Sequence, residues 1–175
     1  MKKFSKLPLY LGLSVLVMSV LISVIKVGQT GNLTSQRTKA AVSGSSLELK
    51  FTSPNTVNVL FNSDKAIKGA DAVIKYDKNK FRILSSTLRS GPSFITTGGV
   101  IDEALGTFSF SALATKDVLA GIIANFKVVT SGNLQQANGE LTIQEGRGGS
   151  AVFDAKTVQN ILNKTTGVKV NVVSK

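Results

Sequence analysis

The chain has 175 residues, enough for one domain with accessory segments, and its 21 Lys and Arg outnumber its 10 Asp and Glu for a net charge of +11. It contains no His and no Cys, which excludes the usual zinc sites, thiolate nucleophiles, a Ser–His relay and disulfides. With no catalytic, metal-binding or cofactor-binding pattern in view, the sequence indicates a protein that is not an enzyme.

The positive charge is spread along the chain. Residues 1–50 hold seven Lys and Arg against one Glu, and residues 51–175 hold fourteen against nine acids. The only dense basic run is Lys75, Lys78, Lys80 and Arg82, and there is no Arg-rich helix or aromatic RNA-binding motif. Dispersed Lys is typical of a solvated face, so nucleic acid is not expected as a partner.

Residues 7–25, LPLYLGLSVLVMSVLISVI, form an uncharged and mostly apolar run that follows Lys2, Lys3 and Lys6. As a helix this run spans roughly 28 Å, close to the ~30 Å hydrocarbon core of a bilayer. The preceding Lys residues predict a cytoplasmic N-terminus and an exported remainder. We therefore expect residues 1–27 to be a single-pass anchor at the cell membrane, with residues 7–25 in the lipid bilayer and an extracellular C-terminal domain. A cleaved signal peptide is the alternative, although its apolar stretch usually has about 7–15 residues.

Residues 28–46 are rich in Gly, Ser and Thr, the composition of a flexible linker. From Leu47 onward, apolar residues alternate with polar ones, which is typical of half-buried strands. Strands are expected at 47–51, 57–61, 70–76, 81–84, 94–97, 107–111, 122–129, 140–144, 151–153 and 168–172. A short helix-like stripe at 155–162 is interpreted as a connector. This pattern predicts an all-β sandwich or jelly roll over residues 47–173.

From about Ser45 to Val173 the order of these segments resembles the cohesin domain, the receptor module of cellulosome-type assemblies. The strongest match is GADAVIKYD at 69–77 followed by FRIL at 81–84, an alternating strand that ends in Tyr-Asp and leads through a turn into the next strand. Further matches are GTFSF at 106–110, LAGIIANFKV at 119–128, AVFD at 151–154 and GVKV at 167–170. The resemblance implies a nine-stranded jelly-roll β-sandwich that binds protein. The typical partner is a dockerin, a small calcium-loaded helical module, docked on the flat outer face of one sheet.

Strand alternation locates this face. On strand 70–76 the residues expected inside are Ala70, Ala72, Ile74 and Tyr76, and those outside are Asp71, Val73 and Lys75. On strand 107–111, Phe108 and Phe110 are expected inside, which leaves Thr107, Ser109 and Ser111 outside. The six outward residues are the candidate partner-binding surface, and the resemblance places Asp71 where family members carry a polar dockerin contact. The plain alternative is that Asp71 is a solvent-facing residue that keeps the sheet soluble.

Other readings of the sequence are weaker. Asp102, Glu103 and Asp117 are interpreted as solvated surface acids rather than a glycosidase pair. The GRGG run at 146–149 lacks the Gly-Lys-Ser/Thr ending of a phosphate loop and is interpreted as a bulge or hairpin turn. Asp77 and Asn79 are expected to cap a turn rather than to bind calcium.

Two alternative functions stay open at this point, a carbohydrate-binding module and a structural cell-envelope subunit. Sugar sites usually stack rings on exposed aromatic planes, and the chain has no Trp. A polysaccharide partner is therefore less favoured than a protein partner.

Overall fold

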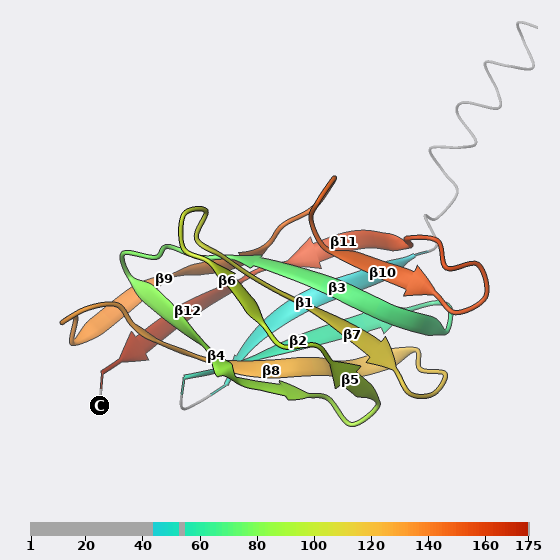
Figure 1. Cartoon of the computed structure of the whole chain (residues 1–175), viewed down its shortest axis with the longest axis horizontal. Helices are drawn as coiled ribbons and strands as arrows, with labels where there is room; N and C mark the ends of the chain where they lie inside the picture. Colours follow the sequence, from blue (N-terminus) through green and yellow to red (C-terminus); the bar gives the residue numbers. More distant parts are fainter. Residues whose placement is uncertain (1–43, 53–54, 175) are drawn as a thin grey trace, which may run out of the picture. The chain divides into compact units, whose positions relative to one another are not determined.

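The computed structural model describes residues 44–52 and 55–174, which form an all-β sandwich (Figure 1). The predicted anchor at 1–27 lies outside the described residues, as does most of the predicted linker at 28–46. Within the described ranges, no helix is long and apolar enough to cross a membrane. The first strand begins at Ser45, so the last two residues of the predicted linker belong to the sandwich.

The five-stranded sheet has the order β11-β1-β2-β8-β4. Its strands are β1 (Ser45–Thr52), β2 (Thr56–Ser63), β4 (Phe81–Ser90), β8 (Ala120–Thr130) and β11 (Leu162–Thr166). All pairs in this sheet are antiparallel except β1 with β11, which is parallel.

The seven-stranded sheet has the order β12-β9-β3-β7-β5, with β10 paired to β3 and β6 paired to β7. Its strands are β3 (Ile67–Lys75), β5 (Phe94–Thr96), β6 (Val100–Asp102), β7 (Thr107–Ala114), β9 (Gln136–Ile143), β10 (Ala151–Asp154) and β12 (Val168–Val173). Among the described residues, every pairing in this sheet is antiparallel.

The described residues contain twelve strands, where the resemblance implied nine. Three features explain the difference. Strands β9 and β10 pair with successive parts of one edge of β3 and are separated only by the loop at 144–150. Strands β11 and β12 form one run of chain that changes sheets at Gly167, and β6 has only three residues. Counting each divided strand once and leaving out β6 gives the nine expected.

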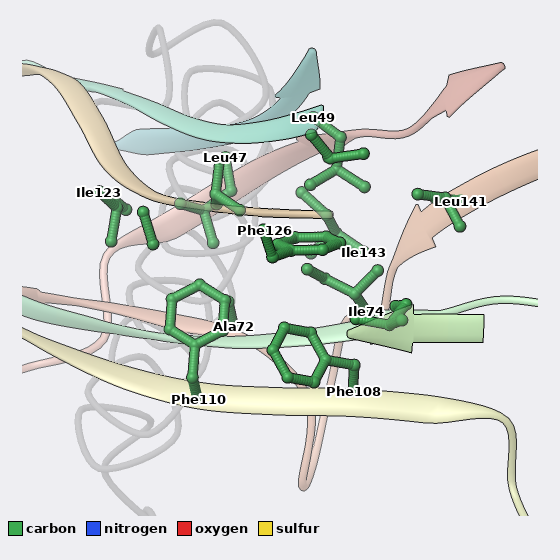
Figure 2. Packing of buried hydrophobic residues seen from close by; sticks show 14 of the residues in the cluster. Leu47, Leu49, Ala72, Ile74, Phe108, Phe110, Ile123, Phe126, Leu141 and Ile143 are labelled. Atoms are coloured by element: carbon green, nitrogen blue, oxygen red, sulfur yellow. The ribbon is translucent and has the colours of Figure 1, made fainter. Parts of the chain in front are cut away.

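The core lies between the two sheets and is built from the inward residues of the alternating strands. Ala70, Ala72, Ile74 and Tyr76 are all buried, as are Phe108 and Phe110, which confirms the predicted inward sets. The ring centroids of Phe108 and Phe126 lie 5.1 Å apart, and those of Phe108 and Phe110 lie 5.8 Å apart. Figure 2 shows these three rings in the space between the sheets.

Strand β8 includes the nearly continuous apolar run IIANFKVV at 122–129 and is internal to its sheet, but only one of its faces is covered. Ile123 and Ala124 are both buried because the pairing with β2 shifts register between Val59 and Leu60. On the outer side, Asn125 is half-buried and Lys127 is exposed. The apolar run thus reflects a bulge rather than burial on both faces.

A tight turn anchored by Asp154 connects β10 to β11. The side chain is buried, and its Oδ1 accepts hydrogen bonds from the backbone N–H of Lys156 at 2.8 Å and of Thr157 at 2.7 Å. The Thr157 hydroxyl donates to the same oxygen at 3.0 Å. These bonds, the Thr157 N–H first, favour the carboxylate and hold the pKa of Asp154 below its usual value.

We predict that Phe126→Ala lowers the free energy of unfolding by about 3–5 kcal/mol, because it removes a fully buried ring and leaves a cavity between the sheets. Urea unfolding followed by circular dichroism measures the change. Leu105→Ala, at an exposed turn position, serves as the control and should stay within about 0.5 kcal/mol of the unmodified chain. Equal losses in the two variants would contradict this account of the core.

The Asp154 turn predicts a pH dependence of stability. Because the folded-state pKa is depressed, the stability contributed by the carboxylate is present above its ordinary pKa and is lost as pH falls through the folded-state value. Asp154→Asn keeps an acceptor oxygen but cannot titrate. Urea unfolding of both proteins between about pH 5 and pH 2 should show a steeper loss for the unmodified chain. Parallel curves would show that Asp154 does not contribute.

Candidate protein-binding site

The six residues predicted from alternation lie together as three cross-strand pairs. Asp71 is opposite Ser111, Val73 is opposite Ser109, and Lys75 is opposite Thr107. Because residues paired across antiparallel strands share a face, all six lie on the outer face of the β3–β7 pair. Lys75 and Ser111 are exposed and the other four are half-buried. Their predicted position is therefore confirmed, while their role in binding stays a prediction.

The carboxylate of Asp71 is oriented by its cross-strand neighbour. The Ser111 hydroxyl donates to Asp71 Oδ1 at 2.6 Å. Ser111 is in turn held by Thr97, since the Ser111 N–H donates to the Thr97 hydroxyl at 3.0 Å and the Thr97 N–H donates to the Ser111 carbonyl at 2.9 Å. Asp71 makes no ion pair with any described residue. It therefore presents a fixed negative charge to an incoming group.

The Gly-rich loop at 144–150 borders this face. Ser150 is buried, and its hydroxyl accepts the Val73 N–H at 2.8 Å, while the Gln144 N–H donates to the Val73 carbonyl at 2.8 Å. Gly146 and Gly148 have φ of 84° and 76°, which suits glycine. Of the two forms predicted for this loop, a bulge or a hairpin turn, the hairpin is wrong, because β9 and β10 pair with β3 rather than with each other.

A hollow of about 370 Å³ lies over the middle of the face. Its floor includes four of the six predicted residues, namely Asp71, Val73, Ser109 and Ser111. Its walls come from the loop that carries Gly148 and Gly149 and from the segment between Thr97 and Val100. The first wall is a loop and the second is a loop that leads into the first residue of β6, so the two walls form a shallow rim around the flat sheet surface.

Next to the polar hollow is an apolar row that was not among the residues predicted from the sequence. Phe153 is opposite Gly69, Gly69 is opposite Leu113, and Leu113 is opposite Ile95. Leu113 is 52% exposed and Ile95 is 63% exposed. Together with Val158 they line a second hollow of about 370 Å³ that also reaches Asp71 and Ser111. Large exposed apolar side chains gathered in this way are typical of an interaction site.

Gly69 keeps the floor of this second hollow open. A Cβ at this position would lie 2.4 Å from the carbonyl oxygen of Ala112, closer than real contacts allow. No side chain therefore fits between Phe153 and Leu113. The signal available in the sequence was the outward phase of Leu113, two residues beyond Ser111, and of Ile95 in the strand predicted at 94–97.

Val158 reaches the apolar hollow from the turn that Asp154 anchors. Its φ is 56°, in the left-handed region that β-branched residues rarely adopt, and its side chain is 62% exposed. The Val158 N–H donates to the Asp154 carbonyl at 3.0 Å, which fixes this conformation. Strained residues held by their surroundings often occur at functional sites. The segment at 155–162, predicted as a connector, thus also supplies an edge of the site.

The opposite end of the face is charged. Asp102 pairs with Thr107 across β6 and β7, next to Lys75. Burial raises the pKa of Tyr76 at this end, and the nearby Glu103 and Asp102 raise it further. Along β3 and β7 the face therefore changes from apolar, through polar, to charged.

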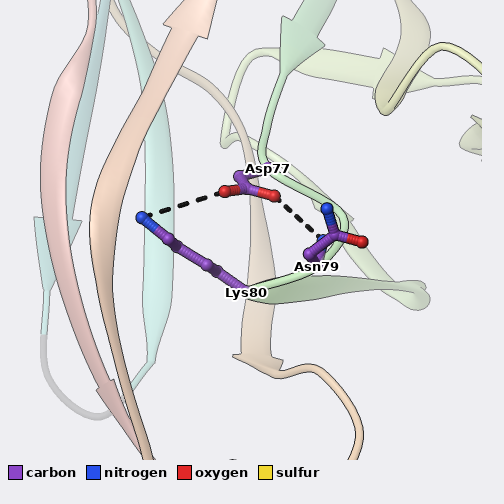
Figure 3. A network of polar contacts seen from close by, with 3 residues as sticks. All are labelled: Asp77, Asn79 and Lys80. Atoms are coloured by element: carbon purple, nitrogen blue, oxygen red, sulfur yellow. Dashed lines mark hydrogen bonds and ion pairs between the residues drawn. The ribbon is translucent and has the colours of Figure 1, made fainter.

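Two of the acids that were considered as catalytic groups or calcium ligands, Asp77 and Asp102, stabilise turns. Asp77 Oδ1 accepts the Asn79 N–H at 3.0 Å, and Asp77 Oδ2 lies 3.8 Å from Lys80 Nζ (Figure 3). Asp102 Oδ1 accepts the Leu105 N–H at 3.0 Å. Within the part of the chain that the structure describes, no three His, Cys, Asp or Glu side chains gather as metal ligands would.

Comparison with known proteins identifies the fold. No protein-family model matches the chain, and no curated protein matches it. Among solved structures, a chain of a type II cohesin–X–dockerin complex from Acetivibrio cellulolyticus is similar, with 15% identity, a TM-score of 0.54, and coverage of 71% of this chain and 98% of that chain. A chain of a type I cohesin–dockerin complex from Clostridium thermocellum has 13% identity and a TM-score of 0.54, and the match covers 75% of this chain and 94% of that one.

A non-cellulosomal cohesin from the archaeon Archaeoglobus fulgidus is also similar. It has 12% identity and a TM-score of 0.53, with coverage of 75% of this chain and 93% of that one. Structural similarity at these low sequence identities shows the fold and does not identify a partner. The sandwich described here has the cohesin fold.

Proposed function

We propose that the chain is a membrane-anchored, extracellular protein-binding module that recognises its partner with the outer face of β10, β3, β7 and β5. The observation that carries this proposal is that an apolar row and a polar pair of residues lie side by side on that face. The apolar row of Phe153, Leu113 and Ile95 lies directly beside the Asp71–Ser111 pair. Apolar anchors bordered by oriented polar groups are the usual make-up of the centre of a protein interface.

The chemistry of the face defines the partner. An apolar side chain of the partner would enter the hollow over Gly69, and a hydrogen-bond donor or cation would meet the carboxylate of Asp71. Solved structures with the same fold include cohesin–dockerin complexes, which supports a dockerin-type partner. The anchor and the extracellular location are supported by the apolar run at 7–25 and the Lys residues that precede it.

The exposed surface favours protein over polysaccharide. None of the strongly exposed large apolar side chains in the described residues is aromatic; they are Ile95, Val100, Leu105, Leu113, Leu119, Leu134, Val158 and Val173. Aliphatic side chains suit the apolar contacts of a protein interface, whereas sugar rings stack on aromatic planes.

We predict that Asp71→Arg with Val73→Arg reduces partner capture at least tenfold, because two long cations replace an acceptor and fill the polar hollow. The full chain, held in detergent micelles and immobilised, is exposed to lysate and secreted fractions of its own host with calcium or with a chelator. Thr52→Arg with Asn62→Arg, on the outer face of the other sheet, is the matched control and should capture normally.

Calcium-dependent capture of a protein with repeated Asp-rich loops would identify a dockerin-type partner. Capture that does not depend on calcium would support a protein-binding module with a different kind of partner. Unchanged capture by the Asp71→Arg, Val73→Arg variant would remove this face from the proposal. If the folded chain captured no protein, the proposed protein-binding function would be contradicted.

We further predict that Val158→Gly has opposite effects on stability and binding. Glycine relieves the left-handed strain, so the unfolding free energy should rise by about 1 kcal/mol. Loss of the exposed side chain should weaken capture of the partner about tenfold. Val173→Gly, at an exposed position in β12 remote from this face, should instead lower stability by about 0.5–1 kcal/mol. Destabilisation by both substitutions would contradict the role of Val158.

A further inference from the structure

The outer face of the five-stranded sheet is strongly basic. Five exposed cationic side chains lie on it with a single acid, Glu48; they are Lys50, Arg82, Arg89, Lys127 and Lys164. The pairing register puts them on one side of the sheet. Lys50 and Arg89 are the two ends of a row that passes through Asn58 and Asn125. Lys127 is opposite Leu84, Arg82 is opposite Val129, and Lys164 is opposite Ser46.

This face carries the entire net charge of the described residues. Residues 44–52 and 55–174 contain fourteen Lys and Arg and ten Asp and Glu, a net charge of +4. The face holds five of these cations and one of these acids, which is also +4. The nine cations and nine acids elsewhere cancel. This distribution of charge produces a positive electrostatic potential at the outer face of the five-stranded sheet and almost none, on average, over the rest of the domain.

The cations on this face are not neutralised within the domain. The single ion pair among the described residues joins Lys80 to Asp77, neither of which lies on this face. Arg89 donates to the carbonyls of Ser86 and Leu88, at 3.0 and 2.9 Å, which orients the guanidinium without removing its charge. None of the strongly exposed large apolar side chains lies on these strands' outer face. The surface therefore favours an anionic partner over an apolar one.

The size and position of the face suit an extended surface. Five strands about 4.8 Å apart give a width of roughly 19 Å, over which the cations are spread rather than gathered into a pocket. The chain enters this same sheet through β1, which begins at Ser45. In the sequence, the 19 residues at 26–44 separate β1 from the apolar run at 7–25. The proposed anchor and this sheet are therefore close neighbours in the sequence.

We propose that this basic face lies against the anionic lipid headgroups of the bilayer that holds the N-terminal anchor. The inference rests on the anchor in the proposed function, and it extends that function by giving the domain an orientation. The two sheets face opposite ways, so the face of β10, β3, β7 and β5 points away from the lipid toward its partner. Each cation near an anionic surface strengthens the association about fivefold. The contact is weak for one side chain and substantial for five.

The test uses the full chain in nanodiscs, which contain either phosphatidylcholine alone or about 30% phosphatidylglycerol. Because the chain has no Cys, single nitroxide labels can be attached after Asn62→Cys on the basic face or Thr142→Cys on the opposite sheet. A nickel-chelating lipid reports the closeness of each label to the headgroups. We expect strong relaxation of the Asn62→Cys label in anionic discs only, with little relaxation of the Thr142→Cys label in either disc.

Two variants with the same net charge distinguish an effect of the cations on this face from an effect of the total charge of the chain. The triple variant Lys50→Gln, Arg82→Gln, Lys127→Gln removes three cations from the face. It should lower the association constant of the face for the anionic surface about a hundredfold. Lys116→Gln with Lys156→Gln and Lys169→Gln removes three cations from elsewhere and should leave the relaxation unchanged. Both variants should capture the partner normally, because none of these residues lines the partner site.

Several results would overturn the proposal. Equal relaxation of the two labels, or relaxation of the Asn62→Cys label that ignores anionic lipid, would show that the basic face does not rest on the bilayer. Binding of soluble polyphosphate through the same three cations, without contact in anionic discs, would identify a soluble polyanion instead. A chain that does not co-elute with phosphatidylcholine discs would refute the anchor itself, separately from the orientation of the domain.

Discussion

The packing of Phe108 against Phe126 is the contact on which the rest of the structure depends. It joins β7 of one sheet to β8 of the other, and it fixes which side of each strand faces inward. Side chains alternate along a strand, so a slip of one residue would exchange every inward residue for an outward one. The inward position of Phe108 therefore dictates the outward position of Thr107, Ser109 and Ser111. The packing of the core therefore determines which side chains form the candidate binding surface.

Alternation also explains how much the sequence could reveal. All ten predicted strands occur, and the six candidate site residues lie on one face, because Ala70, Ala72 and Phe110 follow a clear period of two. The misses occur where that period fails. Strand β11 reads LNKTT and has too few apolar residues to alternate, and β6 has only three residues. The extension of β4 from Leu84 to Ser90 follows a register shift against β8, which no local pattern indicates.

The candidate site was only partly predictable for a related reason. Its polar half lies on the two strands with the strongest patterns, whereas its apolar half combines four segments distant in sequence, at Gly69, Ile95, Leu113 and Val158. The contribution of Val158 depends on a left-handed backbone angle set by the Asp154 turn. Neither the angle nor the meeting of these segments can be read from local sequence. The chain shares its fold with solved cohesin structures to which it is 12–15% identical. The fold determines where the strands lie, and the side chains on them determine what the surface can bind.

The place where the chain enters the sandwich has a mechanical consequence. Strand β1 is not at the edge of its sheet, since β2 pairs along one side of it and β11 along the other. A pulling force that arrives at Ser45 from the N-terminal segment therefore acts along a strand held by two ladders of hydrogen bonds. An edge strand can peel away one bond at a time. An internal strand has to shear past both neighbours together, so a load that enters the sandwich at Ser45 meets high resistance at the first strand it reaches.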